Sequence, residues 1–194
     1  MDLKASTSCL CLLLPALSLA ADGAAPVRTY DLPGHGRLEF SVPAAWKEEI
    51  NRPPGDLPPT IEFSPAAGNE FSVQITPLFS PAGDPDYNQM KKIRPLLEEI
   101  GRKQLEASVE KEITLQKIKG AEAAGYYFTV TDRAPKKDEW TYLTEGAAGV
   151  GDLLVSFTIL TNSLDSGELR QALRLIESCR QIKPTDKPQV PPGR

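Results

Sequence analysis

The chain has 194 residues, of which 40% are apolar and 25% charged, close to the average of a soluble globular domain. This composition excludes the disordered, fibrous and membrane-spanning classes. Lysine and arginine number 22 against 26 acids, which gives a net charge of −4. An acidic surface repels phosphate backbones and anionic lipids, so we expect no nucleic-acid partner.

The N-terminal segment has the order of a secretory signal peptide. Lys4 is followed by the apolar run Cys9–Leu19, and small residues end at Ala20. We predict a signal peptide over residues 1–20, with cleavage after Ala20. The run is too short to span a bilayer. Because Ala21 rather than a cysteine follows the predicted cleavage point, we expect an exported protein, periplasmic or secreted, and not a lipoprotein.

Cys179 is the one cysteine left after this cleavage, so the exported chain has no partner for an intramolecular disulfide. Its stability must come from a hydrophobic core. We predict a linker over residues 21–27, a single domain over 28–182 and a proline-rich tail over 183–194. We expect a monomer.

The first half of the domain shows short runs of alternating apolar residues, typical of half-buried strands. The predicted strands are Arg28–Leu32, Arg37–Val42, Thr60–Ser64 and Phe71–Thr76. The first two are joined through Pro33-Gly34-His35-Gly36, whose glycines suit a tight hairpin. The loop Asn51–Pro59 is too rich in proline for a central strand.

The period then changes to that of an amphipathic helix over Asp86–Ser108. Its apolar positions are Met90, Ile93, Leu97 and Ile100, with Leu96 beside them. Pro95 interrupts this pattern, because a proline removes a helical hydrogen bond and clashes with the preceding turn. Of a kink and a break, we favour a break after Arg94.

The second half of the domain returns to strands and ends in a helix. The predicted strands are Glu112–Lys119, Gly125–Asp132, Glu139–Gly146 and Leu153–Thr161, with loops at Arg133–Asp138 and Ala147–Asp152. Leu153–Thr161 is the most continuously apolar, so we place it centrally, with helices on both sides. Asp165 and Glu168 resemble a capping box that starts the last helix. This order predicts one α+β domain with a mainly antiparallel sheet of about six to seven strands packed between helices.

Three segments resemble the PsbP-like superfamily, which includes bacterial DcrB-like envelope proteins and a nuclear transport factor that binds the GTPase Ran. They are Leu38–Trp46, Gly120–Thr131 and Phe157–Leu160, followed by a closing helix. The resemblance covers about Val27–Lys183 and implies an α/β/α sandwich. Members generally bind protein partners or assist assemblies, so it implies a binding module, and it transfers no site residues.

The sequence contains no constellation of residues that dictates a chemistry. His35 is the only histidine and lies in a predicted turn, where nothing orients it for catalysis. With Cys179 as the one mature cysteine, a zinc site of nitrogen and sulfur ligands cannot form within one chain. Asp84 and Asp86 lack the ligand spacing of an EF-hand loop. We therefore predict no catalytic, cofactor-binding or metal-binding residues and no cofactor.

Several motifs have structural interpretations. Cys179 is in register with apolar helix positions, which favours burial over a redox role. Ser108 begins an S-x-x-K pattern without the two companion motifs of penicillin-interacting enzymes. Gly146, Gly149 and Gly151 have the wrong spacing for nucleotide binding and are interpreted as turn glycines. The acids between Glu98 and Glu112 alternate with lysines, as on a solvated helix face.

Two surfaces remain as candidates for a partner. Outward aromatic residues of the hairpin around Trp140 would make good anchors, and the Arg52–Pro59 loop would be a preorganised docking segment. The leading hypothesis is a noncatalytic exported module that binds another envelope protein or helps to assemble one. The alternative is a carrier of a small apolar ligand. A hydrolase comes third and would require carboxylates with raised pKa values that converge in a cleft.

Overall fold

The computed structural model describes residues 25–55, 57–80 and 84–184. The predicted signal peptide and residues 185–194 of the predicted tail lie outside these ranges. Within them, the strands are β1 (Val27–Leu32), β2 (Gly36–Ser41), β3 (Trp46–Asn51), β4 (Thr60–Pro65), β5 (Phe71–Phe79), β6 (Gln116–Lys119), β7 (Ala123–Thr131), β8 (Tyr142–Val150), β9 (Leu153–Thr161) and β10 (Arg180–Ile182), and the helices are α1 (Met90–Gln104) and α2 (Gly167–Glu177). No helix in these ranges is both long and apolar enough to cross a membrane.

A seven-stranded antiparallel sheet forms the centre of the fold, with the order β3-β4-β5-β9-β8-β7-β6. The predicted central position of Leu153–Thr161 is confirmed, because β9 lies between β5 and β8. Phe157 at its middle pairs with Ile75 on one side and Gly146 on the other. The sequence of β9 is almost continuously apolar because the strand is paired on both sides and its first three residues are buried, whichever sheet face they point to.

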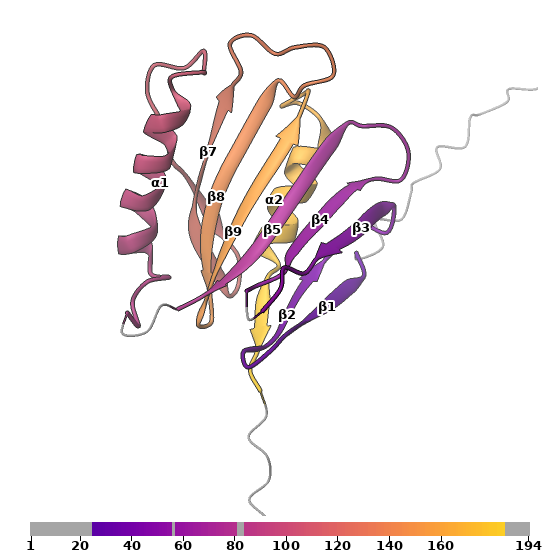
Figure 1. Ribbon diagram of the computed structural model, residues 1–194, viewed down its shortest axis with the longest axis vertical. Helices are drawn as coiled ribbons and strands as arrows, with labels where there is room; N and C mark the ends of the chain where they lie inside the picture. Colours follow the sequence, from indigo (N-terminus) through magenta and orange to yellow (C-terminus); the bar gives the residue numbers. More distant parts are fainter. Residues whose placement is uncertain (1–24, 56, 81–83, 185–194) are drawn as a thin grey trace, which may run out of the picture.

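One face of this sheet carries the main covering layer of the fold. Here α2 and a second, three-stranded sheet of order β1-β2-β10 pack side by side against it (Figure 1). Phe40 of the small sheet meets Phe63 of β4 edge to face, with ring centroids 5.8 Å apart. Ala172 and Ile176 of α2 belong to the same core. The large sheet therefore buries its main hydrophobic layer on this side.

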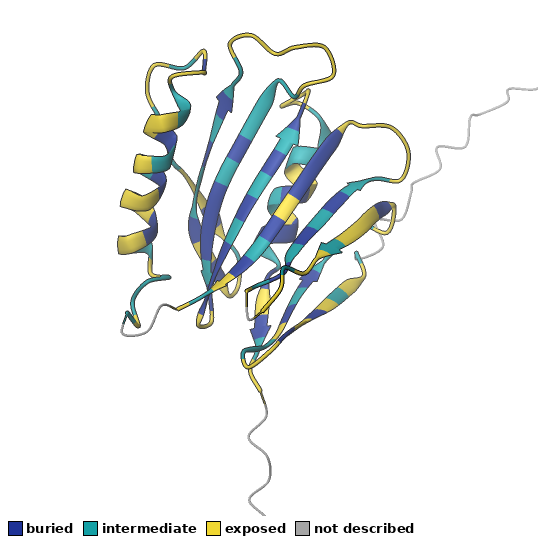
Figure 2. Cartoon of the chain, viewed as in Figure 1, coloured by how far each residue is buried: buried dark blue, intermediate teal, exposed yellow. Residues whose placement is uncertain are grey.

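The opposite face is covered only in part. α1 packs over β7 and β8, where Ile93 and Leu97 meet Phe128 and Leu154 in a second core. Figure 2 shows the outward side of α1 exposed and the side toward the sheet buried. The helices therefore lie on opposite faces, as predicted, but no part of the described chain forms a layer over β3, β4 and β5 on the α1 side (Figure 1).

Two strands were not predicted, β10 of the small sheet and β3 at the edge of the large sheet. The hairpin of β1 and β2 is confirmed, with Leu32 opposite Gly36. However, β10 pairs with β2 over a separation of more than 140 residues, and its three residues carry no periodic signal. β3 was likewise missed, because four of its six residues are charged or amide-bearing, as is common on an exposed edge strand.

The predicted break after Arg94 is wrong, because α1 continues through Pro95. A proline inside a helix costs about 3 kcal/mol through the lost hydrogen bond and the ring clash. Ile93 and Leu97 flank Pro95 and are almost fully buried against the sheet. Burying two such side chains contributes about 3 to 6 kcal/mol, which is enough to hold the helix together.

Two further predictions need correction. α2 begins after Ser166, and no side chain caps its N-terminus, so the predicted capping box at Asp165 and Glu168 does not form. The segment predicted as a loop at Ala147–Asp152 belongs to β8 as far as Val150, and only Gly151 lies in the turn with a positive φ. Gly146 and Gly149 are therefore strand residues rather than turn glycines.

These strand glycines are places where other atoms approach the backbone. A Cβ added at Gly146 would lie 2.2 Å from a ring carbon of Phe157, and one at Gly149 would lie 2.3 Å from the Asn88 carbonyl oxygen. Glycine in β8 is thus required by packing across the sheet.

We expect Gly146→Ala to lower the free energy of unfolding by about 1–3 kcal/mol, because the new methyl group displaces the Phe157 ring in a filled core. Gly167→Ala is the matched control, since its nearest atom would be 4.0 Å away and its φ is ordinary. Urea unfolding followed by circular dichroism measures both. Equal stability of the two variants would contradict the packing explanation.

Candidate functional site

The border between α1 and the open part of the sheet contains two pockets, which we call together the α1 trough. The inner pocket, of about 230 Å³, lies beside the middle of α1, and the outer pocket, of about 260 Å³, lies beyond its C-terminal end. The inner pocket is lined by Leu78, Leu96, Leu97, Ile100, Glu145, Gly146, Ala147, Leu154, Ser156, Phe157 and Thr158. The outer pocket is lined by Gln104, Ala107, Ser108, Val130, Asp132, Glu139, Trp140, Thr141, Tyr142, Leu143 and Leu160.

The apolar walls of the inner pocket follow from the periods of its elements. Ile93 and Leu97 of α1 pack into the second core. This orientation leaves Leu96 on the side of the helix, with 41% of its surface exposed. Across from it, Leu78 at the end of β5 is 36% exposed and pairs with Leu154 of β9. Two exposed leucines therefore border the same pocket.

Glu145 is the charged residue in this apolar strip. The side-chain amide of Gln104 donates a 3.1 Å hydrogen bond to its Oε2 atom, which links the lining of the outer pocket to that of the inner one. Burial raises the pKa of the Glu145 carboxyl above its usual range, and the Gln104 hydrogen bond acts in the opposite direction. In the described ranges, no lysine, arginine or histidine forms an ion pair with it.

The sequence analysis did not single out Glu145, Gln104 or Leu96. For Glu145 a signal was present, since it is the only charged residue in the stretch 140–151, which contains the whole of β8. For Gln104 and Leu96 there was none, because an amide near a helix end and a leucine beside an apolar stripe are both common.

The predicted Trp140 hairpin contributes to the trough. Trp140 and Tyr142 are both partly exposed and line the outer pocket. The other predicted aromatic residues divide between core and surface. Trp46 and Phe128 are buried, and Tyr126 lies beside α1, with the Arg94 guanidinium 6.0 Å from its ring centre. The structure thus places Trp140 at one end of the trough, whereas Tyr142 precedes Leu143 in β8 and so has its side chain on the other sheet face.

The Arg52–Pro59 loop is not brought to this site. It joins β3 to β4 beyond the pair Asn51 and Thr60, whereas the Trp140 hairpin lies beyond the Tyr142–Thr161 pair at the other end of the sheet. The two surfaces that the sequence left as alternatives are therefore separate, and only one of them adjoins an apolar pocket found here.

The sequence analysis considered His35, Cys179 and Ser108 as candidates for chemistry, and the structure shows a packing or hydrogen-bond contact for each. His35 stacks on Phe79, with ring centroids 3.9 Å apart, and so holds the hairpin turn against the large sheet. Cys179 is buried beside Ala172 and Ile176 as predicted, and burial raises the pKa of its thiol. The hydroxyl of Ser108 donates a 2.6 Å hydrogen bond to the Gln104 carbonyl oxygen at the end of α1.

The acids of the helix lie on its solvated face, as predicted. Glu98 pairs with Arg94 and Glu99 with Lys103, each within one helical turn. Glu110 instead accepts hydrogen bonds from the backbone and hydroxyl groups of Thr131. These carboxylates do not converge in a cleft.

Two other glutamates stand opposite each other on the open part of the sheet. Glu49 and Glu62 form a cross-strand pair of β3 and β4, next to Gln74, in a polar pocket of about 300 Å³. They lie side by side on one sheet face, and Glu145 is three strands away from Glu62, the nearer of the two, which is about 14 Å at the usual strand spacing. Glycosidases hold a sugar between two carboxyl groups that flank it, an arrangement that these glutamates do not form.

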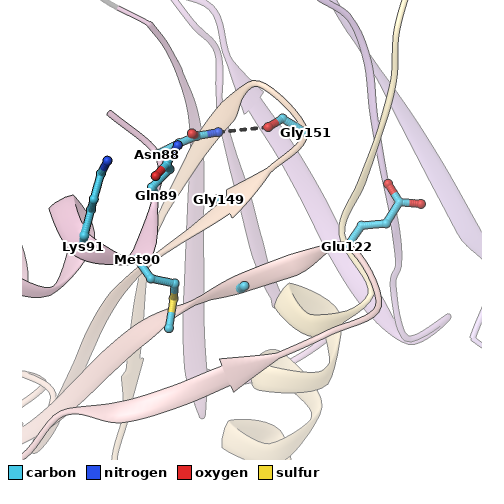
Figure 3. A pocket seen from close by; sticks show the side chains of 8 residues that line it. Asn88, Gln89, Met90, Lys91, Glu122, Gly149 and Gly151 are labelled. Carbon is cyan, nitrogen blue, oxygen red and sulfur yellow. Dashed lines mark hydrogen bonds between the residues drawn. The ribbon is translucent and has the colours of Figure 1, made fainter. Parts of the chain in front are cut away.

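A further pocket, of about 570 Å³, lies at the N-terminus of α1 (Figure 3). The Asn88 side chain donates hydrogen bonds to the carbonyl oxygens of Gly151 and Leu153, at 3.0 and 3.1 Å. Figure 3 shows Lys91 and Glu122 on opposite sides of the hollow, directed away from each other. This region anchors α1 to the turn between β8 and β9, and its charged groups do not converge.

The comparisons with known proteins bear on the fold. No family model matches the chain, and no curated protein does. Among solved structures, the chain is similar to the solution structure of cyanobacterial PsbP (CyanoP) from Synechocystis sp. PCC 6803. The two are 12% identical, with a TM-score of 0.52, and the match covers 87% of this chain and 99% of that one.

The chain has a PsbP-like fold. The resemblance stated from Leu38–Trp46, Gly120–Thr131 and Phe157–Leu160 is thereby confirmed at the level of fold. A crystal structure from Bacteroides thetaiotaomicron also matches, with 16% identity and a TM-score of 0.47 over 75% of this chain, which spans 45% of that protein.

The position of Glu145 predicts a pH dependence of stability. A carboxyl with a raised pKa is protonated more readily in the folded than in the unfolded protein, so stability falls as the pH rises from 4.5 through the raised value. Glu145→Gln removes this loss. We expect the variant to unfold at higher temperature than the wild type at pH 7, and the difference to shrink at pH 4.

Thermal unfolding of both proteins at the two pH values measures this effect. Glu106→Gln is the control, because Glu106 is an exposed residue just beyond α1. A pH-independent difference between Glu145→Gln and wild type would show that the carboxyl does not titrate differently in the folded state.

Proposed function

We propose that this protein is an exported, noncatalytic PsbP-like module that binds another envelope protein or assists its assembly through the α1 trough. The observation that carries the proposal is the strip of partly exposed apolar side chains along α1, with Trp140 at one end. Exposed apolar residues gathered beside an open pocket are typical of protein-binding surfaces. The PsbP-like fold supports it, because the resemblance implies proteins that bind protein partners.

The dimensions of the trough favour a protein over a small ligand. Pockets for drug-sized ligands measure about 300–1,000 Å³ and enclose most of the ligand surface. Both trough pockets are smaller than this, about 230 and 260 Å³. Side chains of a docked partner fit such pockets, since each needs room for one residue only.

Capture of the partner tests the proposal. The tagged mature protein is crosslinked in cells of the native host, and the captured proteins are identified by mass spectrometry. We expect one reproducible envelope partner. Leu96→Glu and Trp140→Ala should reduce its yield by about 10-fold or more, since a buried leucine contributes about 1.5–3 kcal/mol and 1.4 kcal/mol is a factor of ten.

Leu57→Glu is the matched control, because Leu57 is also exposed but lies in the proline-rich loop at the other end of the sheet. We expect it to leave the yield unchanged. Loss of capture with Leu57→Glu and not with Leu96→Glu would show that the partner docks on that loop and not on the trough. Capture equal to that of an unrelated exported protein would overturn the proposed function, and native mass spectrometry would then test for a retained ligand.

Export itself is a separate prediction. If residues 1–20 are a signal peptide, the protein isolated from the host's envelope or medium begins at Ala21. Intact-mass measurement of that protein distinguishes this outcome from an uncleaved chain that begins at Met1. Substituting Ala20 with arginine should block cleavage, because the position before the cut requires a small residue.

A further inference from the structure

The inner pocket of the α1 trough combines apolar walls with one carboxylate, that of Glu145, which forms no ion pair with a cation of the described residues. Leu96 and Leu78 border the inner pocket, and Glu145 lies between them and the outer pocket. Burying part of a carboxylate among leucines is unfavourable unless a cation or several hydrogen bonds offset the lost hydration. In the described chain, Glu145 receives one hydrogen bond, from a neutral amide.

One oxygen of this carboxylate is open to the trough. Gln104 occupies Oε2, and no described group bonds to Oε1. No fully buried side-chain oxygen or nitrogen in the described chain lacks a hydrogen-bond partner, so Oε1 must be reachable by solvent. Because Glu145 lines the inner pocket, an incoming group reaches Oε1 through the trough.

We propose that the partner protein inserts a lysine side chain into the inner pocket and places its ammonium on Oε1 of Glu145. This inference rests on the proposed function and specifies the chemistry of the partner. The four methylene groups of lysine pack against Leu96 and Leu78, and the ammonium at their end supplies the missing cation. Arginine fits less well, because its planar group binds best to both oxygens of a carboxylate and Gln104 already occupies one.

On the α1 side, the uncovered strands beside the trough carry two glutamates and one lysine, Glu49, Glu62 and Lys47, which leaves a net negative charge. Glu62 and Glu49 lie on the α1 side of the sheet, in the same cross-strand row as Gln74, Thr158 and Glu145. Like charges directly opposite each other destabilise a sheet. A basic partner surface would relieve this repulsion and be steered toward the trough.

The direct test uses a defined probe. N-acetyl-lysine N-methylamide, which presents the lysine side chain between neutral amides, is titrated into the ¹⁵N-labelled mature protein while amide chemical shifts are followed. We expect saturable shifts at Glu145 and Thr158, with a dissociation constant in the millimolar range. The norleucine analogue has the same stem without the ammonium, and we expect it to bind at least about 10-fold more weakly, as should the arginine analogue.

Two variants separate the site from general charge. Glu145→Gln should weaken lysine binding by about 10-fold or more, and Glu106→Gln, which removes the same charge from an exposed position, should leave it unchanged. Glu145→Gln is nearly isosteric, and its folding is checked by the same spectra. Equal binding of norleucine and lysine, tighter binding of arginine, or shifts spread over all acidic surfaces would each overturn the proposal.

The outcomes also distinguish this inference from the proposed function. If lysine binds at Glu145 but no protein is captured, the proposed function fails and the site is one for small amines. If a partner is captured through Leu96 but lysine does not bind and Glu145→Gln captures normally, only the lysine inference fails. A carbodiimide crosslink, which joins a carboxylate to an amine, should connect Glu145 to a lysine of the captured partner.

Discussion

The fold depends on burial of the apolar residues on one face of a seven-stranded sheet. That face carries the largest apolar side chains, among them Phe63 and Phe157, and neither α2 nor the small sheet is wide enough to cover it alone. Both are needed side by side, which is why the chain returns after α2 to add β10 to β2. Closing this layer removes a large apolar area from water and provides the main stabilisation of a domain whose one cysteine in the described ranges is free.

The opposite face carries the surface that we propose for docking of a partner. α1 covers β7 and β8 and stops there, so a helix flank meets an uncovered sheet and leaves an apolar strip between them. Antiparallel sheets tolerate one solvated face, and β3, β4 and β5 carry polar residues toward it. The trough exists because the helix is narrower than the sheet. Pro95 weakens the turn of α1 in which it lies. The buried residues of the helix offset this loss through their packing in the second core.

Local sequence patterns identified most strands and both helices, because alternation and the 3.6-residue period are properties of short segments. They failed where a long-range contact decides the structure. Nothing local marks Arg180–Ile182 as a strand, since its one partner among the described strands is β2. Gly146 and Gly149 resemble turn glycines until Phe157 and Asn88 are seen against them. The sequence predicted only part of the candidate site. Trp140 was anticipated, whereas the hydrogen bond of Glu145 with Gln104 joins residues that are 41 positions apart in the chain.

The sequence by itself determined the class of the protein: an acidic α+β chain with an apolar N-terminal run, a PsbP-like succession of elements, and no set of residues that dictates a reaction. These properties depend only on composition and on patterns a few residues long. Only the tertiary structure decided which face of the sheet is left open, which aromatic residues point outward, and that Leu96, Leu78 and Glu145 border one pocket. The reason is physical: a pocket is a property of the space between elements, and that space depends on how α1 packs across strands that are distant in the chain.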